Sequence, residues 1–166
     1  KKVSDAVQDA ELAAKSIDKI SDAGKSAAKV AEDLKGAGKT SDKIILSAKN
    51  NQALIGYNVD NFTTITLKKG DKIYGMTPGQ GQWYTNAEML EKSDYSYKKM
   101  YDGLQIKPHP IFGYRTSVTI YEVTEDVTVA TGKALANKDI GTGGYTQYFI
   151  ENFSNVLKPL KEIKLK

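Results

Sequence analysis

The sequence predicts an α+β fold in which a helical N-terminal segment precedes a domain rich in antiparallel strands. Residues 1–49 are rich in Ala, Lys, Asp and Glu and contain no aromatic residue. From residue 50 onward Tyr and Thr are frequent, glycines punctuate the chain, and several short runs alternate between apolar and polar residues. Period-two alternation is typical of strands with one buried face, and three- or four-residue recurrence is typical of helices. We therefore expect two parts, residues 1–49 and residues 50–166.

The first part carries narrow, alanine-rich apolar stripes. One stripe consists of Val3, Val7, Ala10, Ala14, Ile17 and Ile20. Gly24 ends it, a weaker stripe covers residues 27–34, and a short third piece is expected around Ile44. Such helices are marginal alone and need packing partners. Two interpretations stay open: a helical linker, or a delivery segment that contacts a membrane or receptor.

The second part reads as a succession of short strands. Strands are expected at residues 62–67, around 73–74, at 117–123, 127–130 and 145–150, and at the C-terminus. "KKGD" predicts a turn between the first two strands. Asn86 predicts the start of one helix, or two short ones, up to residue 101. The C-terminal region predicts a short helix broken by Pro159 before the last strand.

Composition excludes several kinds of function. The formal net charge is +4, and basic and acidic residues interleave without a dense Lys/Arg run, which argues against a nucleic-acid-binding arm. There is no cysteine and a single histidine, so disulfides, thiolate chemistry and a Cys/His zinc site are not expected. No run of 18 apolar residues and no signal peptide are visible. The first residues, "KKVSD", lack methionine, so we expect a piece of a longer protein.

Two residues that occur once in the chain are candidates for chemistry. Arg115 stands at the entrance to the clearest strand, and arginine suits bidentate contact with a phosphate. A surface salt bridge is the plain alternative. His109 lies between two prolines, where it is either an acid–base group or a loop residue. No Ser/His/Asp triad can be assembled around it.

Two glycine-rich loops each run into an aromatic pair. "PGQGQWY" ends in Trp83 and Tyr84, and "GTGGYTQY" contains Gly143 and Gly144. Glycine permits close backbone approach to a ligand, although a tight turn explains it equally well. Neither loop has the lysine and serine of a phosphate-binding P-loop. The aromatic residues of both loops either sandwich a flat ring or are half-buried strand residues.

The order of features toward the C-terminus resembles a known family. The stretch "YEVTEDVTVATGKALANKDIGTGGYTQYFIENF", followed by "LKPLKEIKL", is similar to the tuberculosis necrotizing toxin family of NAD glycohydrolases. That family has a "YxV" strand, a glycine-rich turn, "GGGTQY" and a closing "LKEI". The upstream "LKKGDKIYGMTPGQGQWYT" resembles the segment of the family that contains "DRFG". The resemblance covers residues 62–165 and is closest over residues 121–150.

The resemblance implies an ADP-ribosyltransferase-like core that splits NAD or NADP into nicotinamide and ADP-ribose or its phosphate. It implies a polymorphic or contact-dependent inhibition toxin at the C-terminus of a secreted or surface-delivered bacterial protein. Such a toxin acts in the cytoplasm of the target cell and is neutralised by a cognate immunity protein. NAD(P) is then the substrate, and neither a further cofactor, a metal nor a nucleic acid is expected.

Site residues follow from the resemblance by position. Gln147 matches the catalytic glutamine of the family, and Trp83 stands where the family places an aromatic residue against NAD. Thr146, Tyr84, Gly143 and Gly144 are expected to line the substrate with it. Ile73 and Thr119 occupy the positions of the family's arginine and histidine, so Arg115 is expected to serve in catalysis and His109 in substrate binding from shifted positions.

Three other functions remain open at this point. A mono-ADP-ribosyltransferase would use the same fold and substrate. A toxin ribonuclease would use His109, Arg115, lysines and tyrosines for acid–base and phosphate work. A binding module without enzymatic activity would use the aromatic residues as a platform for a ligand.

Overall fold

The computed structural model describes residues 41–166. The predictions for the apolar stripes of residues 1–40 lie outside this range. The elements are α3 (Ser41–Leu54), β1 (Thr63–Leu67), β2 (Lys72–Thr77), β3 (Trp83–Tyr84), α4 (Ala87–Lys92), α5 (Tyr97–Leu104), β4 (Ser117–Val123), β5 (Val127–Lys133), β6 (Thr146–Phe149), α6 (Phe153–Val156) and β7 (Leu157–Lys164). The predicted α+β class is confirmed.

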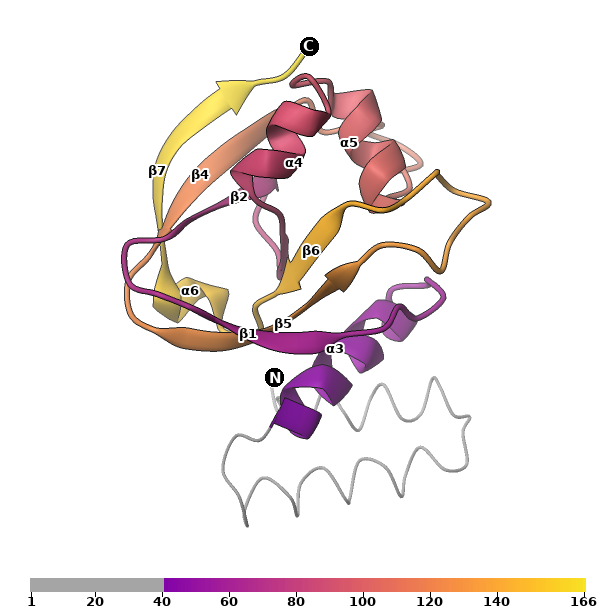
Figure 1. Cartoon of the computed structure of the whole chain (residues 1–166). Helices are drawn as coiled ribbons and strands as arrows, with labels where there is room; N and C mark the ends of the chain where they lie inside the picture. Colours follow the sequence, from indigo (N-terminus) through magenta and orange to yellow (C-terminus); the bar gives the residue numbers. More distant parts are fainter. Residues whose placement is uncertain (1–40) are drawn as a thin grey trace.

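The strands form two antiparallel sheets. One sheet has four strands in the order β1-β5-β6-β3, and the other has three in the order β2-β4-β7. A single bridge between Tyr74 and Thr85 links β2 to the end of β3. Figure 1 shows α3 beside β1 and β5, and α4 and α5 at the opposite end of the molecule. The sheets therefore separate the helices into two groups.

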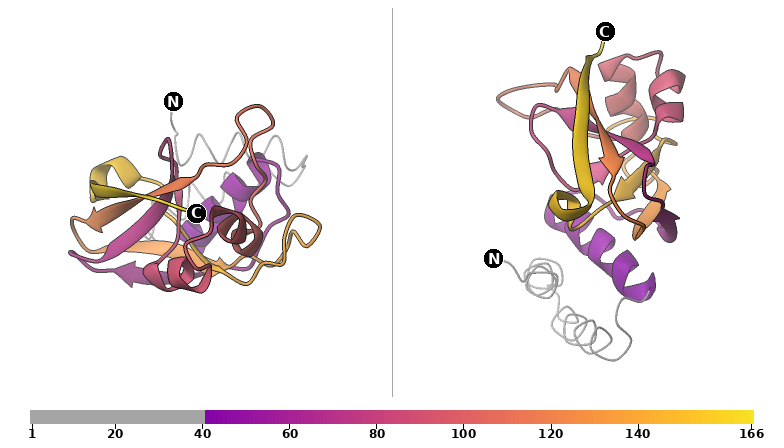
Figure 2. Two further views of the ribbon diagram at one scale, coloured as in Figure 1. Left: turned by 90° about the horizontal axis from the view of Figure 1, so that it is seen from above. Right: turned by 90° about the vertical axis from the view of Figure 1, so that its left-hand side faces the viewer.

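The main core lies where the two sheets face each other. It joins Ile73 and Tyr121 of the three-stranded sheet to Tyr84, Val129 and Tyr148 of the four-stranded sheet. Each strand contributes alternate residues, as the period-two pattern requires. Gly75 lets the sheets approach closely, because a Cβ there would lie 3.0 Å from the ring of Tyr84 and 3.2 Å from that of Tyr121. Figure 2 shows the layered arrangement from two further sides.

The helix α3 covers the outer face of the four-stranded sheet. Ile44 and Ile45 pack against a cluster that contains Ala48, Phe62 and Phe149. The predicted boundary between residues 49 and 50 falls inside this helix. The short piece expected around Ile44 is thus the first half of a helix that continues into the second part and packs on its sheet. The full length of α3 was not predicted because its apolar face is narrow.

The region from residue 86 to 104 forms two helices rather than one. The side chain of Asn86 caps α4 by accepting the N–H of Met89, as predicted, and Ser96 caps α5 in the same way. Asp94 and Tyr95 between them have positive φ angles of 56° and 58°. A right-handed helix cannot continue through two left-handed residues, so the chain ends α4 and starts again.

The C-terminal prediction is partly corrected. A short helix and a final strand are present, but Pro159 lies inside β7 opposite Tyr121 and does not break the helix. β7 is an edge strand, and the register of its pairing with β4 shifts beside this position. Proline is tolerated there because an edge strand and an irregular pairing do not need its missing N–H.

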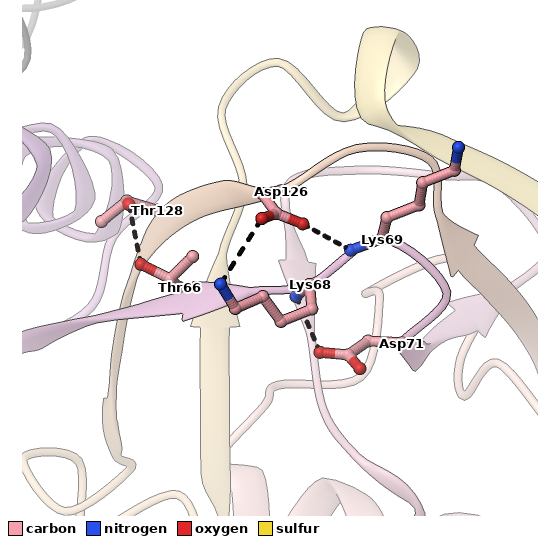
Figure 3. A network of polar contacts seen from close by, with 6 residues as sticks. All are labelled: Thr66, Lys68, Lys69, Asp71, Asp126 and Thr128. Carbon is pink, nitrogen blue, oxygen red and sulfur yellow. Dashed lines mark hydrogen bonds and ion pairs between the residues drawn. The ribbon is translucent and has the colours of Figure 1, made fainter.

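The predicted "KKGD" turn between β1 and β2 is confirmed, and Gly70 in it has φ of 96°. Figure 3 shows how two exposed carboxylates hold it. Asp71 accepts the N–H of Lys68 at 2.8 Å, and Asp126 accepts the N–H of Lys69 at 2.9 Å. The backbone hydrogen bond from Lys69 is the main cause that lowers the pKa of the Asp126 carboxyl. Both carboxylates therefore serve the turns at one end of the sheet.

Candidate functional site

Gln147 lies in the middle of a buried polar network. It occupies the second position of β6, opposite Gly132 of β5, and is 7% exposed. Its Nε2 donates to Oδ2 of Asp60 at 2.9 Å. Gln52 of α3 donates to the same carboxylate oxygen at 2.7 Å. The network thus joins the helix above the sheet to the strand that carries the predicted catalytic residue.

Asp60 is saturated with hydrogen-bond donors. Its Oδ1 accepts the backbone N–H groups of Leu135 and Ala136 at 2.8 and 2.7 Å, while its Oδ2 accepts from Gln52 and Gln147. Four donors fill the capacity of an ionised carboxylate. The side chain is 3% exposed. A buried charge must be stabilised by hydrogen bonds, and α3, β6 and the 134–137 loop provide the donors for this carboxylate.

The contact with Asp60 decides the orientation of the Gln147 amide. An ionised carboxylate only accepts hydrogen bonds, so the NH₂ group of Gln147, and not its oxygen, must face it. Within residues 41–166 no group donates to Oε1 of Gln147. The structure therefore gives Gln147 an oriented amide whose acceptor end has no protein partner in the described part of the chain.

Sequence reasoning missed Asp60 as a site residue. It stands in a polar stretch, "NVDNF", that looks like any solvated loop. Only the tertiary structure reveals it, because α3, the 134–137 loop and β6 meet over this carboxylate from distant parts of the chain. Two of its donors are the backbone N–H groups of residues 135 and 136, which almost any residue type provides. No pattern of residue types therefore predicts this site.

A second set of buried amides continues the network toward α5. Gln105, the left-handed C-cap of α5, accepts the N–H of Asn137 at 2.9 Å and donates to the carbonyl of Gly141 at 3.0 Å. Asn137 in turn exchanges hydrogen bonds with the backbone of Asn58. The loop from 134 to 144 is thereby held from both sides.

The glycine-rich loop packs against α5, and its glycines make hydrogen bonds within the protein. The N–H of Gly143 is bonded to the carbonyl of Asp102 and that of Gly144 to the carbonyl of Ala134. Both residues have positive φ, of 79° and 94°. A Cβ on Gly143 would lie 2.3 Å from the Ala134 carbonyl oxygen. The close approach that requires glycine at 143 is to the protein's own backbone, and neither N–H remains free for a nucleotide.

Asp102 fastens the same loop by accepting hydrogen bonds from Thr142. The hydroxyl of Thr142 bonds one carboxylate oxygen and its N–H bonds the other, the latter at 3.0 Å. These two bonds, the hydroxyl first, lower the pKa of the Asp102 carboxyl. The ionised form of Asp102 thus favours the folded loop.

Replacing Thr142 by Val should move the pKa of Asp102 back toward its ordinary value, but only part of the way, since the N–H at 142 still donates. A group with a depressed pKa stabilises the fold above its unfolded pKa and loses this contribution as pH falls through the folded pKa. The stability difference between Thr142→Val and the unmodified chain should therefore shrink in acid. NMR titration of the Asp102 carboxyl carbon measures the shift, and an unchanged titration would contradict the contact.

The two aromatic residues after the first glycine-rich loop are already engaged in packing. Trp83 donates its Nε1–H to Asn51 of α3 at 2.8 Å, and its ring lies 4.9 Å from Phe149 and 5.9 Å from Phe62. Tyr84 is buried, donates its hydroxyl to the Gly81 carbonyl at 2.6 Å, and burial raises its pKa. Trp83 is thus a half-buried strand residue and Tyr84 a buried one, and both side chains are hydrogen-bonded within the protein.

Of the remaining predicted residues, Thr146 adjoins Gln147, whereas Arg115 and His109 lie elsewhere. Thr146 precedes Gln147 on β6, and its carbonyl accepts the Thr85 hydroxyl at 2.7 Å. Arg115 stands before β4 in the other sheet, where its Nη1 donates to the Met76 carbonyl at 3.3 Å. His109 lies farther out in the same connection, and its Nδ1 accepts two backbone N–H groups. The structure thus brings Thr146 and Gln147 together on one strand, whereas Arg115 and His109 belong to another region.

Two features of the described residues bear on other classes of site. Between residues 41 and 166, no group of three or more acidic or histidine side chains is arranged to hold a metal ion. In the same part of the chain, none of the helices has the length and apolar character needed to cross a bilayer.

The fold and the buried network describe an α+β domain with an oriented amide at its centre. The family model of the Rhs1 C-terminal toxin domain matches residues 40–152. The chain therefore belongs to the Rhs1 C-terminal toxin domain family. The matched range includes α3 from its first residue and ends after β6, so it contains the Asp60–Gln147 network. No curated protein sequence matches the chain.

Chains from three solved complexes are similar to this chain. The structure titled Rhs1-CT in complex with cognate immunity protein RhsI1 is 37% identical with a TM-score of 0.63, covering 64% of this chain and 83% of that one. Tse6 in complex with Tsi6 is 17% identical with a TM-score of 0.47, covering 80% and 91%. Tne2 in complex with Tni2 is 17% identical with a TM-score of 0.46, covering 64% and 95%. The family and the fold rest on the family model and on Rhs1-CT.

Proposed function

We propose that this toxin domain hydrolyses NAD or NADP to nicotinamide and ADP-ribose or its phosphate inside the cell that receives it, and that a cognate immunity protein neutralises it. The toxin character follows from the family. The immunity partner is supported by the complex in which the similar Rhs1-CT was solved. NAD(P) hydrolysis is supported by the resemblance of the "GGYTQY" stretch to the tuberculosis necrotizing toxin family.

One observation carries the catalytic part of the proposal. Gln147 is held by Asp60 in a single amide orientation, and its Oε1 has no donor from residues 41–166. A buried acceptor without a partner is costly unless a ligand or water supplies a donor. A ribose hydroxyl or the attacking water has the required O–H. Preorganisation by Asp60 means that the amide needs no rearrangement when charge develops.

The reaction suits a site of this kind. The bond between ribose C1 and the nicotinamide nitrogen breaks, and the electron pair leaves with nicotinamide, which departs neutral from a cationic start. The ribose passes through an oxocarbenium-like state, water adds to C1, and its proton is lost to solvent. Strong acid catalysis is not required. The rate enhancement therefore comes mainly from positioning the ribose and the water.

Arg115 is proposed to hold the pyrophosphate, with less support than Gln147. Its guanidinium is exposed and has one hydrogen bond to the Met76 carbonyl, which leaves further donors for a phosphate. No contact network of the structure joins it to Gln147. Its contribution is therefore tested separately: Arg115→Lys should raise KM for NAD and leave kcat close to the unmodified value, since lysine keeps the charge but loses the bidentate geometry.

Consumption of NAD and NADP by the purified chain tests the proposal directly. The Gln147→Met variant should lose activity by roughly 100-fold or more, in the range seen when one preorganised polar group is removed. Gln52→Met is the control, because it removes a hydrogen bond to the same Asp60 oxygen, and the acceptor of the Asp60 N–H, without touching Gln147. It should lose at least as much stability as Gln147→Met and keep its activity.

The outcomes separate three cases. Activity that falls in both variants in proportion to their stability would make Gln147 a structural residue only. Labelled NAD that modifies a protein, with little free ADP-ribose, would indicate a mono-ADP-ribosyltransferase instead. Killing of an expressing cell without loss of its NAD(P) pool would refute the proposed reaction.

A further inference from the structure

The connection between α5 and β4 contains a closed turn, residues 109–113, which we call the apolar turn. His109 and Gly113 exchange backbone hydrogen bonds of 3.0 and 2.9 Å, and Gly113 has φ of 74°. Nδ1 of His109 accepts the N–H groups of Ile111 and Phe112 at 3.0 and 3.1 Å. The histidine therefore organises the tip of the turn.

The tip presents two large apolar side chains to solvent. Ile111 is 80% exposed and Phe112 is 81% exposed, whereas the other exposed large apolar side chains of the described residues range from 38% to 51%. Among residues 41–166, the ring contact of Phe112 is with His109, at 4.7 Å between centroids. Both views of Figure 2 show this connection projecting from the body of the molecule.

The base of the projection is packed against α5. Tyr114 packs its ring against Tyr97 and Tyr101, at 5.3 and 4.8 Å between centroids. The N–H of Arg115 donates to the Tyr101 hydroxyl at 2.8 Å. Single exposed apolar residues are common on protein surfaces. Two adjacent ones on a hydrogen-bonded turn with an anchored base are arranged in advance, which lowers the entropy cost of binding.

The charged residues that flank the apolar turn in sequence are both positive. Residues 103–121 contain Lys107 and Arg115 and no Asp or Glu. A partner pocket that accepts Ile111 and Phe112 would therefore gain from carboxylates at its rim, which also steer the encounter. A fixed side-chain geometry benefits a shaped protein pocket, whereas a lipid bilayer accepts apolar side chains in any orientation. The rigid turn thus favours a protein partner.

We propose that the apolar turn is an anchor of the immunity complex, with Ile111 and Phe112 inserted into an apolar pocket rimmed by carboxylates on the cognate immunity protein. This inference rests on the proposed function for the existence of that partner. Aromatic side chains that fill a pocket commonly dominate the binding energy of such interfaces.

The experiment uses the full chain and a protein that protects cells expressing it, with affinity measured by isothermal titration calorimetry. The double variant Ile111→Ser, Phe112→Ser should raise Kd by about 100-fold, as expected when an interface anchor is removed. Leu160→Ser removes an exposed apolar side chain of β7, 44% exposed, and serves as the control with unchanged Kd. The double variant should keep its NAD hydrolysis and kill cells in spite of the protecting protein.

His109 variants test the organisation of the turn. His109→Leu removes the acceptor for both N–H groups and should weaken binding by about 10-fold through loss of preorganisation. His109→Asn provides an oxygen that can accept the same N–H groups, as in an Asx turn, and should recover most of the affinity. Equal affinities for the two variants would contradict this role of His109.

Three results would overturn the inference. The first is a double variant that binds the protecting protein within about threefold of the unmodified chain, far below the loss expected for an anchor. The second is binding of the unmodified chain to phosphatidylglycerol vesicles that the double variant loses while its binding to the protecting protein is unchanged. The third, no complex between the unmodified chain and any protecting protein, would also refute the immunity part of the proposed function, which the NAD assay does not touch.

Discussion

The Asp60→Asn variant of the full chain should lose roughly 3–5 kcal/mol of unfolding free energy, since two buried donors each cost about 1–3 kcal/mol when unsatisfied. An asparagine retains one acceptor oxygen and presents NH₂ in place of the other. Either the N–H groups of Leu135 and Ala136 or the amides of Gln52 and Gln147 then face a donor. Urea unfolding followed by circular dichroism measures the loss.

Asp126→Asn is the matched control for this substitution. Asp126 also accepts a backbone N–H, from Lys69, and pairs with Lys68, but it is exposed. Water replaces its lost hydrogen bonds, so its effect should be much smaller than that of Asp60→Asn. Similar losses for the two variants would contradict the burial of Asp60. Because Asp60 orients Gln147, Asp60→Asn should also lower NAD hydrolysis under conditions where the variant is still folded.

The Gly143→Ala variant should lose roughly 3–4 kcal/mol, of which backbone strain at positive φ accounts for about 1–2 kcal/mol. The remainder arises because the new Cβ would lie 2.3 Å from the Ala134 carbonyl oxygen and 2.6 Å from Nε2 of Gln105. The loop from 134 to 144 would have to move away from α5. Thermal and urea unfolding of the full chain measure this loss.

Gly144→Ala is the control that separates strain from collision. Gly144 has φ of 94°, but a Cβ there would meet nothing within 4 Å. It should therefore lose only the strain contribution of about 1–2 kcal/mol. A Gly144→Ala loss as large as that of Gly143→Ala would mean that the loop does not pack against Ala134 and Gln105 as the structure has it.

Much of the fold could be predicted from the sequence. The features that were predicted incorrectly all depend on contacts between distant parts of the chain. The two strands on either side of residue 125, the helix cap at Asn86 and the "KKGD" turn depend on neighbours in sequence, and they were predicted correctly. The length of α3 and the place of Pro159 depend on partners far along the chain. α3 has a weak apolar stripe and is held by the sheet beneath it, and Pro159 is accepted because β7 is an edge strand.

For the candidate site, the sequence by itself determined the motif that contains Gln147, because the order of glycines and polar residues along β6 is local. The two prolines around His109 predict an extended backbone, and the closed turn that Nδ1 of His109 organises was not predicted. Only the tertiary structure decided what these residues contact. Asp60 meets Gln147 across 87 positions of sequence, and the glycines of the loop serve α5 and Ala134. Hydrogen bonds to backbone groups and contacts between distant segments leave no periodic pattern, and these interactions fix the chemistry available at the site.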